Sequence, residues 1–254
     1  MTYLSVNLAY EEHGQGTPVM LVHGFPLNRS IWYPLLPLLE NKARLILPDL
    51  RGFGQSPAPE GTYTMRLMAE DLRALLDTLK IDKVVLVGHS MGGYVSLAFA
   101  QAYPHRLAGL ALVSTQAAAD NPEARASREK TVEEVKRRGL KTLADGMAPH
   151  LTCQPALVET LRKLIMKANP VGVIGSLKGM AERPNAQEWL PSITVPTVVI
   201  AGREDAIIPL DRPRLMTQLL GRAWLVETEN AGHMPMMEQP QAVADAILQL
   251  ISSI

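Results

Sequence analysis

Short apolar runs rich in β-branched residues alternate along the chain with longer amphipathic stretches. This alternation is typical of parallel strands joined by crossover helices. Most of the short runs are apolar throughout, which indicates strands that are covered on both faces. The predicted strands span residues 18–22, 44–48, 83–88, 107–114, 196–201 and 223–227, and a stretch that alternates between polar and apolar residues precedes them at 3–11.

Two amphipathic stretches predict helices that pack on this sheet. In the stretch 65–79 the apolar residues recur at a helical spacing, so that they share one face, and charged residues lie off that face. The stretch 240–251 repeats the pattern. The sequence therefore predicts an α/β fold with a mostly parallel sheet and helices on both of its faces.

The stretch 117–190 interrupts this alternation. It is helical in pattern, contains no convincing strand and opens with a charged run at 125–141. Because both signs of charge are interspersed in that run, it indicates a solvated helix face rather than a binding surface. We therefore expect a helical cap at 117–190, inserted into a core domain formed by 1–116 and 191–254.

Charge and composition narrow the class of partner. The 254 residues include 25 Lys and Arg and 25 Asp and Glu, so no net charge attracts nucleic acid or an anionic membrane. The N-terminal residues lack the pattern of a signal peptide, and no apolar run approaches the roughly 20 residues of a membrane span. The single cysteine, Cys153, lies in no motif. We expect a cytoplasmic protein with no nucleic-acid or membrane partner, and a homo-oligomer is possible.

The most informative motif surrounds Ser90. It reads Gly-His-Ser-Met-Gly-Gly, follows the strand at 83–88 and leads into a helix-compatible stretch at 94–103. A Gly-x-Ser-x-Gly sequence between a strand and a helix is typical of a nucleophile elbow, whose sharp turn requires small neighbours. The start of the helix also directs backbone N–H groups toward a developing negative charge. We therefore predict Ser90 as the nucleophile and the Met91 N–H as an oxyanion donor.

The partners of such a serine follow in the chain order Ser, Asp or Glu, His. Asp205 lies in the loop after the strand at 196–201, and we choose it over Glu204 as the acid. His233 lies in the loop after the next strand and is the predicted general base. Asp49 is a rival acid, but the chain order and the placement of Asp205 argue against it.

A glycine-containing turn after the strand at 18–22 reads His-Gly-Phe-Pro. The Phe25 N–H in this turn suits a second oxyanion donor, and we expect His23 to hydrogen-bond the loop. The residues Phe25, Leu27 and Met91 near the nucleophile are uncharged, which indicates a small, mainly neutral substrate. The residues assigned to substrate binding are Leu27, His89 and Met234. No His-Glu-x-x-His spacing predicts a metal site.

These motifs occur in order with Asp-x-Arg-Gly-x-Gly-x-Ser, Gly-Arg-x-Asp-x-x-x-Pro and Gly-His-x-x-x-x-Glu-x-Pro. Together they resemble the α/β-hydrolase superfamily. The short cap and the elbow are similar to those of small bacterial carboxylesterases and 3-oxoadipate enol-lactonases, with carbon–carbon-bond hydrolases and cofactor-free perhydrolases as relatives. Haloalkane dehalogenases and epoxide hydrolases carry Asp at the nucleophile position, so Ser90 argues against both.

The resemblance implies a serine hydrolase that cleaves an ester or lactone through an acyl-enzyme on Ser90, with no cofactor or metal. Hydrolysis of a carbon–carbon bond in a vinylogous diketone, and perhydrolase activity, remain as alternative reactions. Outside enzymes, the alternative is a ligand receptor on the same fold that has lost its chemistry.

Overall fold

The computed structural model describes residues 5–254, in which seven strands form one sheet in the order β1-β3-β2-β4-β5-β6-β7. The first strand pairs antiparallel with β3, and all other neighbours pair in parallel. The strands are β1 (Tyr10–His13), β2 (Thr17–Val22), β3 (Ala43–Pro48), β4 (Val84–His89), β5 (Leu107–Val113), β6 (Thr197–Gly202) and β7 (Ala223–Thr228). The predicted mostly parallel sheet is confirmed, and β2 to β7 match their predicted ranges to within one residue at each end.

The alternating stretch at 3–11 forms a strand only at its end. Residues 3 and 4 lie outside the described residues, residues 5–9 form no strand, and β1 begins only at Tyr10. The Val6 N–H donates to Asp71 Oδ1 and the Ala9 N–H donates to Ser56 Oγ, each at 2.9 Å. Because side chains of the core bind these N–H groups, this half-buried segment runs over the core as irregular chain.

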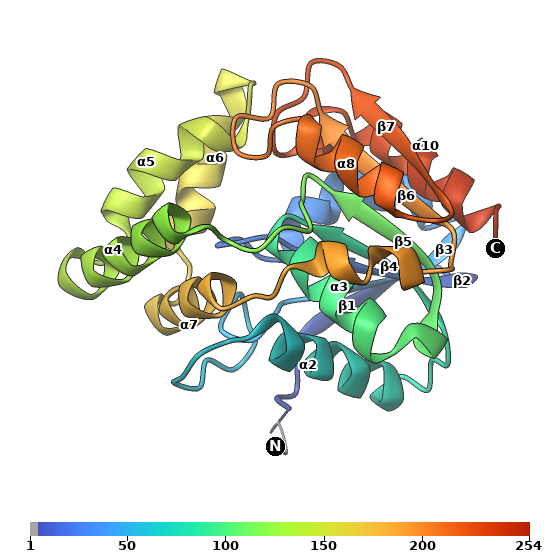
Figure 1. Ribbon diagram of the computed structural model, residues 1–254, viewed down its shortest axis with the longest axis horizontal. Coiled ribbons are helices and arrows are strands. Elements are labelled where there is room, and N and C mark those ends of the chain that lie inside the picture. The colour runs from blue at the N-terminus through green and yellow to red at the C-terminus, as the bar shows by residue number, and fades with distance from the viewer. Residues whose placement is uncertain (1–4) are drawn as a thin grey trace.

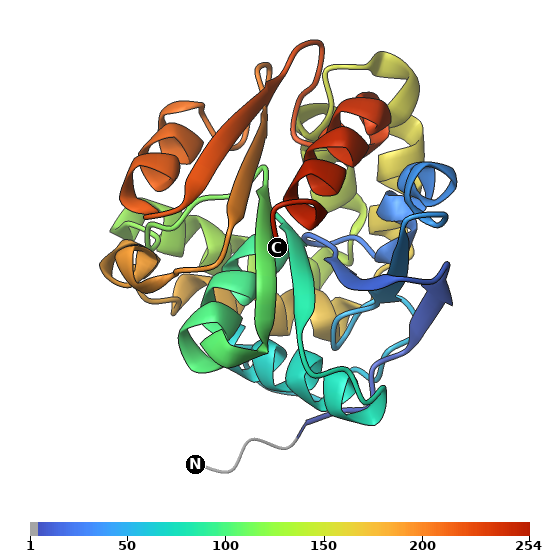
Figure 2. The same cartoon turned by 90° about the vertical axis from the view of Figure 1, so that its right-hand side faces the viewer.

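Side chains of each central strand alternate between two apolar layers. In β2, Val19 and Leu21 join one core cluster, whereas Met20 and Val22 join the other. The helices that cover the sheet are η1 (Arg29–Leu35), α1 (Leu36–Leu39) and α10 (Pro240–Ile251) on the first face, and α2 (Met65–Thr78), α3 (Met91–Ala102) and α8 (Asp211–Leu219) on the second (Figures 1 and 2). The prediction of helices on both faces is thereby confirmed.

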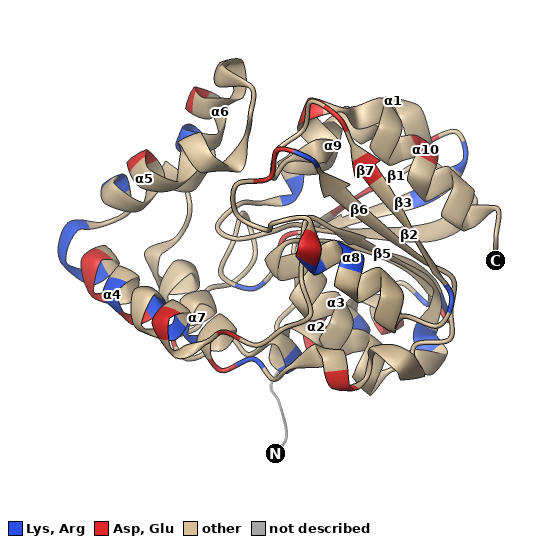
Figure 3. Cartoon of the chain, turned by 45° about the horizontal axis from the view of Figure 1, so that its top comes forward, with Lys and Arg blue, Asp and Glu red and all other residues tan. Residues whose placement is uncertain are grey.

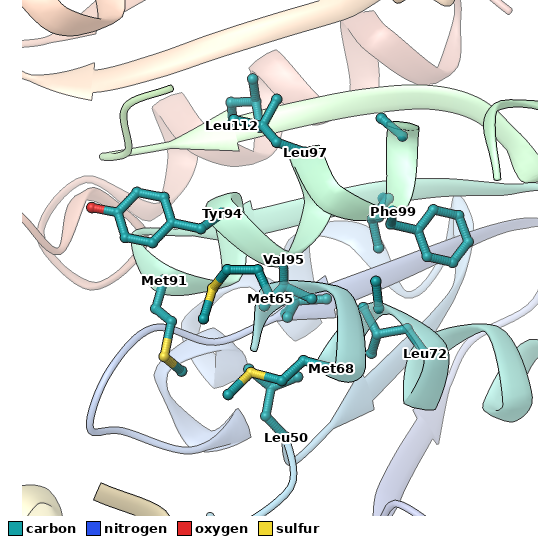
Figure 4. Close-up of a cluster of buried hydrophobic side chains, with 14 of the residues drawn as sticks. Leu50, Met65, Met68, Leu72, Met91, Tyr94, Val95, Leu97, Phe99 and Leu112 are labelled. Carbon is teal, nitrogen blue, oxygen red and sulfur yellow. The ribbon is translucent and has the colours of Figure 1, made fainter. Parts of the chain in front are cut away.

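The layer on the second face brings α2 against the helix that follows Ser90. Figure 4 shows Met65 and Met68 of α2 beside Met91 and Val95 of α3. All four side chains belong to one buried apolar cluster. The start of α3 is therefore fixed by packing as well as by its connection to β4.

Four helices lie between β5 and β6 and stand together beside the sheet (Figure 1). They are α4 (Pro122–Arg138), α5 (Lys141–Leu151), α6 (Pro155–Met166) and α7 (Pro170–Ala181). Charges of both signs are interspersed along α4, which buries only Val132 and Val135 (Figure 3). The division of the chain into a core and a cap at 117–190 stays a prediction. The shorter elements are η2 (Pro104–Arg106), η3 (Ala186–Glu188), η4 (Leu190–Ser192) and α9 (Pro235–Glu238).

Glycines let α7 approach the loop between β3 and α2 backbone to backbone. A Cβ on Gly172 would lie 1.9 Å from the carbonyl oxygen of Gly52, and a Cβ on Gly179 would lie 1.7 Å from that of Tyr63. Between these two contacts, the Tyr63 N–H donates to the Gly175 carbonyl at 2.9 Å. No larger residue could occupy these positions without separating the helix from the loop.

A buried ion pair joins the two ends of the α4–α7 segment. Arg183 Nη1 lies 2.7 Å from Asp120 Oδ1, and Arg128 pairs with the same carboxylate. The Arg183 guanidinium also stacks over the ring of Tyr94 in α3, 4.2 Å from its centroid. Burial raises the pKa of Asp120, but the hydrogen bonds and charges of the two arginines outweigh burial and hold that pKa below its ordinary value.

We predict that Gly179→Ala lowers the free energy of unfolding. The added methyl group would overlap the Tyr63 carbonyl, and such overpacking costs about 1–3 kcal/mol. Thermal and urea unfolding of the variant beside the wild type measure the loss. A Gly179→Ala protein as stable as the wild type would contradict the backbone contact.

Gly146→Ala is the matched control, because Gly146 also lies inside a helix but a Cβ there meets nothing within 4 Å. Alanine is the better helix former, so this substitution should keep or raise the stability, by up to about 1 kcal/mol.

Candidate active site

Ser90 occupies a sharp turn between β4 and α3 with φ 51° and ψ −113°. Few residues other than glycine adopt a positive φ, so the surrounding structure must hold this conformation. The Ser90 N–H donates to the Val113 carbonyl at 2.9 Å. Its carbonyl accepts bonds from the N–H of Gly93 and from Thr115 Oγ1, at 2.9 and 2.8 Å. The turn thereby presents a partly exposed serine at the carboxyl end of a central strand.

The glycines of the motif allow three segments to meet at this turn. A Cβ on Gly88 would lie 2.4 Å from the Gly92 carbonyl oxygen. A Cβ on Gly92 would lie 2.4 Å from the carbonyl oxygen of Val22, and one on Gly93 would lie 2.5 Å from Thr115 Cγ2. Close approach of α3 to β4, to the end of β2 and to the segment after β5 thus explains each glycine of Gly-x-Ser-x-Gly-Gly.

The predicted acid and base meet in the structure. His233 Nδ1 lies 2.8 Å from Asp205 Oδ2, and both side chains are 1% exposed. Because a carboxylate only accepts, Nδ1 donates this bond and Nε2 is left as the basic nitrogen. Asp205 Oδ1 accepts bonds from the N–H groups of Ile207 and Ile208. The neighbouring Glu204 is exposed and takes no part in this network.

His89 connects the loop of His233, the predicted base, to the turn at Ser90. Its Nε2 donates to the His233 carbonyl at 2.8 Å, and the centroids of the two rings are 4.9 Å apart. Ser90, the next residue along the chain, therefore lies close to His233. The ring of Trp32 packs edge-on against the other side of His89.

The two predicted oxyanion donors lie on segments that touch. The close approach of Gly92 to the carbonyl oxygens of Val22 and His23 places the turn after β2 against the start of α3. Within residues 5–254, no hydrogen bond uses the backbone N–H of Phe25 or of Met91. Both groups are therefore free to donate to a substrate oxygen.

The residues predicted to bind substrate have almost no exposed surface. Leu27, His89 and Met234 are each exposed by 1% or less. Leu27 and Met234 belong to the apolar core, and His89 holds the His233 backbone. Their assignment to substrate contacts stays a prediction.

A cavity of about 230 Å³ lies one helical turn from Ser90. It opens between α2, α3 and the segment after α7, and its walls include Tyr94, Ala117, Arg183 and Trp189. Ser90 and His233 are not among the described residues that line it. The cavity is therefore a neighbour of Ser90 and His233 and is not lined by them.

Two histidines of the site are fully buried. The Leu50 N–H donates to His23 Nε2, so His23 Nδ1 carries the proton and donates to the Gly24 carbonyl. His89 Nε2 donates to His233, as described above. Burial lowers the pKa of His23 and lowers that of His89 well below its ordinary value. The bond that His23 Nε2 accepts requires a neutral ring, and the lowered pKa of His89 favours the neutral form there as well.

Glu238 has a place in the site that the sequence did not reveal. Its buried carboxylate accepts hydrogen bonds from the N–H groups of Gly232 and Met234, which flank the base. The fixed spacing of His and Glu in Gly-His-x-x-x-x-Glu-x-Pro is the signal that could have indicated a shared role.

A mostly parallel sheet that carries a serine at such a turn is typical of hydrolases. A family model described as alpha/beta hydrolase fold matches residues 17–240, which is most of the chain. The chain therefore belongs to the α/β-hydrolase family.

Similar proteins include several hydrolases. A solved thermophilic esterase from Thermogutta terrifontis is 41% identical, with a TM-score of 0.94, and the match covers 99% of this chain and 98% of that one. The 3-oxoadipate enol-lactonase 2 of Acinetobacter baylyi is 28% identical over 97% of this chain and 94% of its own length. The 2-hydroxy-6-oxo-2,4-heptadienoate hydrolase of Pseudomonas putida is 29% identical over 89% of this chain and 86% of its own length.

The buried neutral histidines generate a prediction about pH. Both bind a proton more readily in the unfolded chain, where the pKa of histidine is about 6.5. Their contribution to stability is therefore complete above about pH 6.5 and is lost as the pH falls below it, with a slope of up to about 1.4 kcal/mol per pH unit for each histidine. His89→Gln should make the pH dependence of the free energy of unfolding shallower than that of the wild type.

Urea unfolding at about pH 7.5 and about pH 5.5, on either side of the histidine pKa, measures this difference. His105→Gln changes an exposed histidine and should leave the difference between the two pH values unchanged. Equal slopes for His89→Gln and the wild type would show that His89 is not held neutral.

Proposed function

We propose that the chain is a serine hydrolase that cleaves a small, mainly neutral carboxylic ester or lactone through an acyl-enzyme on Ser90. The observation that carries this proposal is the conformation of Ser90, whose backbone is held at φ 51° beside a buried Asp205–His233 pair. A strained serine next to an oriented imidazole is the arrangement that nucleophilic acyl transfer requires.

In the proposed mechanism, Ser90 Oγ attacks the carbonyl carbon while His233 Nε2 takes the hydroxyl proton. The developing oxyanion accepts hydrogen bonds from the N–H groups of Phe25 and Met91. His233 then gives its proton to the leaving oxygen as the carbon–oxygen bond breaks, and Asp205 stabilises the imidazolium in between. Water, deprotonated by His233, finally cleaves the acyl-enzyme.

In this mechanism, the hydrogen bond between Ser90 Oγ and His233 Nε2 forms when substrate binds. The Ser90 hydroxyl makes no hydrogen bond within residues 5–254. Catalytic hydrogen bonds are often long in the free enzyme and tighten when substrate binds.

The substrate class rests on the apolar surroundings of the nucleophile. Phe25 and Met91, which carry the proposed oxyanion donors, have apolar side chains that are buried in one cluster. A charged group placed there would lose its hydration without gaining a partner, so a neutral substrate is favoured. The similarity to an esterase and to an enol-lactonase supports the same class.

A second candidate reaction is hydrolysis of a carbon–carbon bond in a vinylogous diketone. The similarity to the Pseudomonas putida hydrolase favours it. Perhydrolase activity, and a ligand receptor without catalysis, are the remaining alternatives. Comparing turnover of a short p-nitrophenyl ester, an enol-lactone and a vinylogous diketone ranks these reactions, and absence of turnover on all three favours the receptor.

The proposal also includes a cytoplasmic location and a reaction without a cofactor, with no nucleic-acid or membrane partner. Among the helices of residues 5–254, none has the length and apolar character needed to cross a membrane.

We predict that a phosphonofluoridate labels Ser90 stoichiometrically and that Ser90→Ala lowers kcat on the preferred substrate by about 10⁴-fold or more, as in other serine hydrolases. The loss follows because the covalent intermediate can no longer form. Peptide mass spectrometry locates the label, and steady-state kinetics give kcat. Ser127→Ala, at an exposed serine of α4, should behave like the wild type. Full inactivation with the label on another serine would overturn the assignment.

A second substitution tests the acid. Asp205→Asn keeps the size of the side chain, but its amide favours the wrong tautomer of His233, so kcat should fall by roughly 10⁴-fold. Glu204→Gln alters the exposed neighbour and should change kcat little. Steady-state kinetics of both variants measure kcat. A larger loss of kcat in Glu204→Gln than in Asp205→Asn would assign the role of the acid to Glu204.

A further inference from the structure

The carboxylate of Glu238 sits between the segment that carries the base and the junction of α5 and α6. Its Oε2 accepts bonds from the N–H groups of Gly232 and Met234 at 2.8 and 3.1 Å. Its Oε1 accepts bonds from Thr152 Oγ1 and the Cys153 N–H at 2.6 and 2.8 Å. We call these five residues the Glu238 cluster. All four partners are donors, which matches an ionised carboxylate, because that group can only accept.

The cluster fixes the backbone on both sides of His233. Glu238 binds the N–H groups of the two flanking residues, and His89 binds the carbonyl of His233 itself. Asp205 then holds only the imidazole. The position of the ring therefore depends on the backbone contacts, and its tautomer depends on Asp205.

The same carboxylate reaches across 86 residues of chain to Thr152. Backbone contact reinforces the link, because a Cβ on Gly232 would lie 2.9 Å from the Cys153 nitrogen. Gln154 Nε2 also donates to the Glu238 carbonyl at 3.2 Å. A shift of the α5–α6 junction would accordingly act on the loop of the base.

We propose that Glu238 is a positioning residue that holds His233 in reach of Ser90 and couples the base to the α5–α6 junction. This inference rests on the proposed function of His233 as the general base. The expected effect of losing Glu238 is a slower reaction through a misplaced base, since a displacement of about 1 Å in a catalytic group can cost about 10²-fold in rate.

Glu238→Gln is the first test. The amide keeps the size of the side chain, but its NH₂ group faces donors on whichever side it lies, so it breaks either the bonds to the His233 loop or those to the junction. We expect kcat to fall by about 10- to 100-fold with KM changed less than about threefold, because the base is misplaced while the substrate surface is kept. Glu229→Gln is the matched control at an exposed glutamate and should leave both constants unchanged.

Thr152 tests the coupling without touching the His233 loop. Thr152→Val removes the hydroxyl, and with it the bond to Glu238 and the bond that the Gln154 N–H donates to Thr152 Oγ1 at 3.0 Å. We expect the loss of these bonds to lower kcat about two- to tenfold. Thr152→Ser restores the hydroxyl and should recover most of the loss. Equal kcat values for the valine and serine variants would refute the coupling, because a purely structural effect of the lost methyl group would lower the serine variant instead.

Amide hydrogen exchange tests the cluster independently of activity. In the wild type the N–H groups of Gly232, Met234 and Cys153 should be protected, and Glu238→Gln should expose at least one side of the cluster to faster exchange. Unchanged exchange would show that the contacts do not hold the loop. If exchange accelerates while kcat stays at the wild-type value, the positioning role is wrong. If the wild type turns over no substrate and is not labelled at Ser90, the proposed function fails instead, and exchange still decides whether the cluster exists.

Discussion

The backbone conformation of Ser90 is the constraint on which the rest of the site depends. A non-glycine residue at positive φ costs on the order of 1–3 kcal/mol and persists only where its surroundings impose it. Here Val113 and Thr115, at the end of the neighbouring strand, bind the Ser90 N–H and carbonyl. The glycines beside Ser90 remove the side chains that would prevent this contact. Part of the packing energy of the fold thus offsets the strain of holding one serine at the carboxyl end of a central strand.

Two buried histidines connect the turns around Ser90 by hydrogen bonds. His23 joins the turn after β2 to the turn after β3, and His89 joins the nucleophile turn to the loop of the base. Each uses an imidazole that burial keeps neutral, so neither places a positive charge beside His233. In the proposed mechanism, the imidazolium that forms at His233 therefore has no second imidazolium next to it. Such fixed dipoles need no reorganisation during a reaction, which is the usual source of electrostatic stabilisation in enzymes.

Local patterns predicted the sheet and the Asp205–His233 contact better than they predicted contacts over longer distances along the chain. The strands and the turn at Ser90 follow from short runs of sequence, and the Asp205–His233 contact follows from the chain order that this turn implies. The alternating stretch at 3–11 forms a strand only at its end because the side chains of Asp71 and Ser56, far away in the sequence, bind the N–H groups of Val6 and Ala9. The contact between Glu238 and Thr152 was hidden for the same reason, since Thr152 lies 86 residues away.

The α4–α7 segment contacts the rest of the chain at several separate points, and one of these, the α5–α6 junction, lies against the His233 loop. The Asp120–Arg183 pair ties its two ends together over α3, and the glycines of α7 dock it on the loop before α2. Both attachments involve buried charge or backbone contact, where a small displacement is costly. The α5–α6 junction meets the His233 loop through hydrogen bonds to the Glu238 carboxylate and carbonyl, and through the close approach of the Cys153 nitrogen to Gly232. Buried side chains of α5 and α6 also pack in the same apolar cluster as Met234. A displacement of α5 and α6 would therefore act on the backbone around His233 through both polar and apolar contacts.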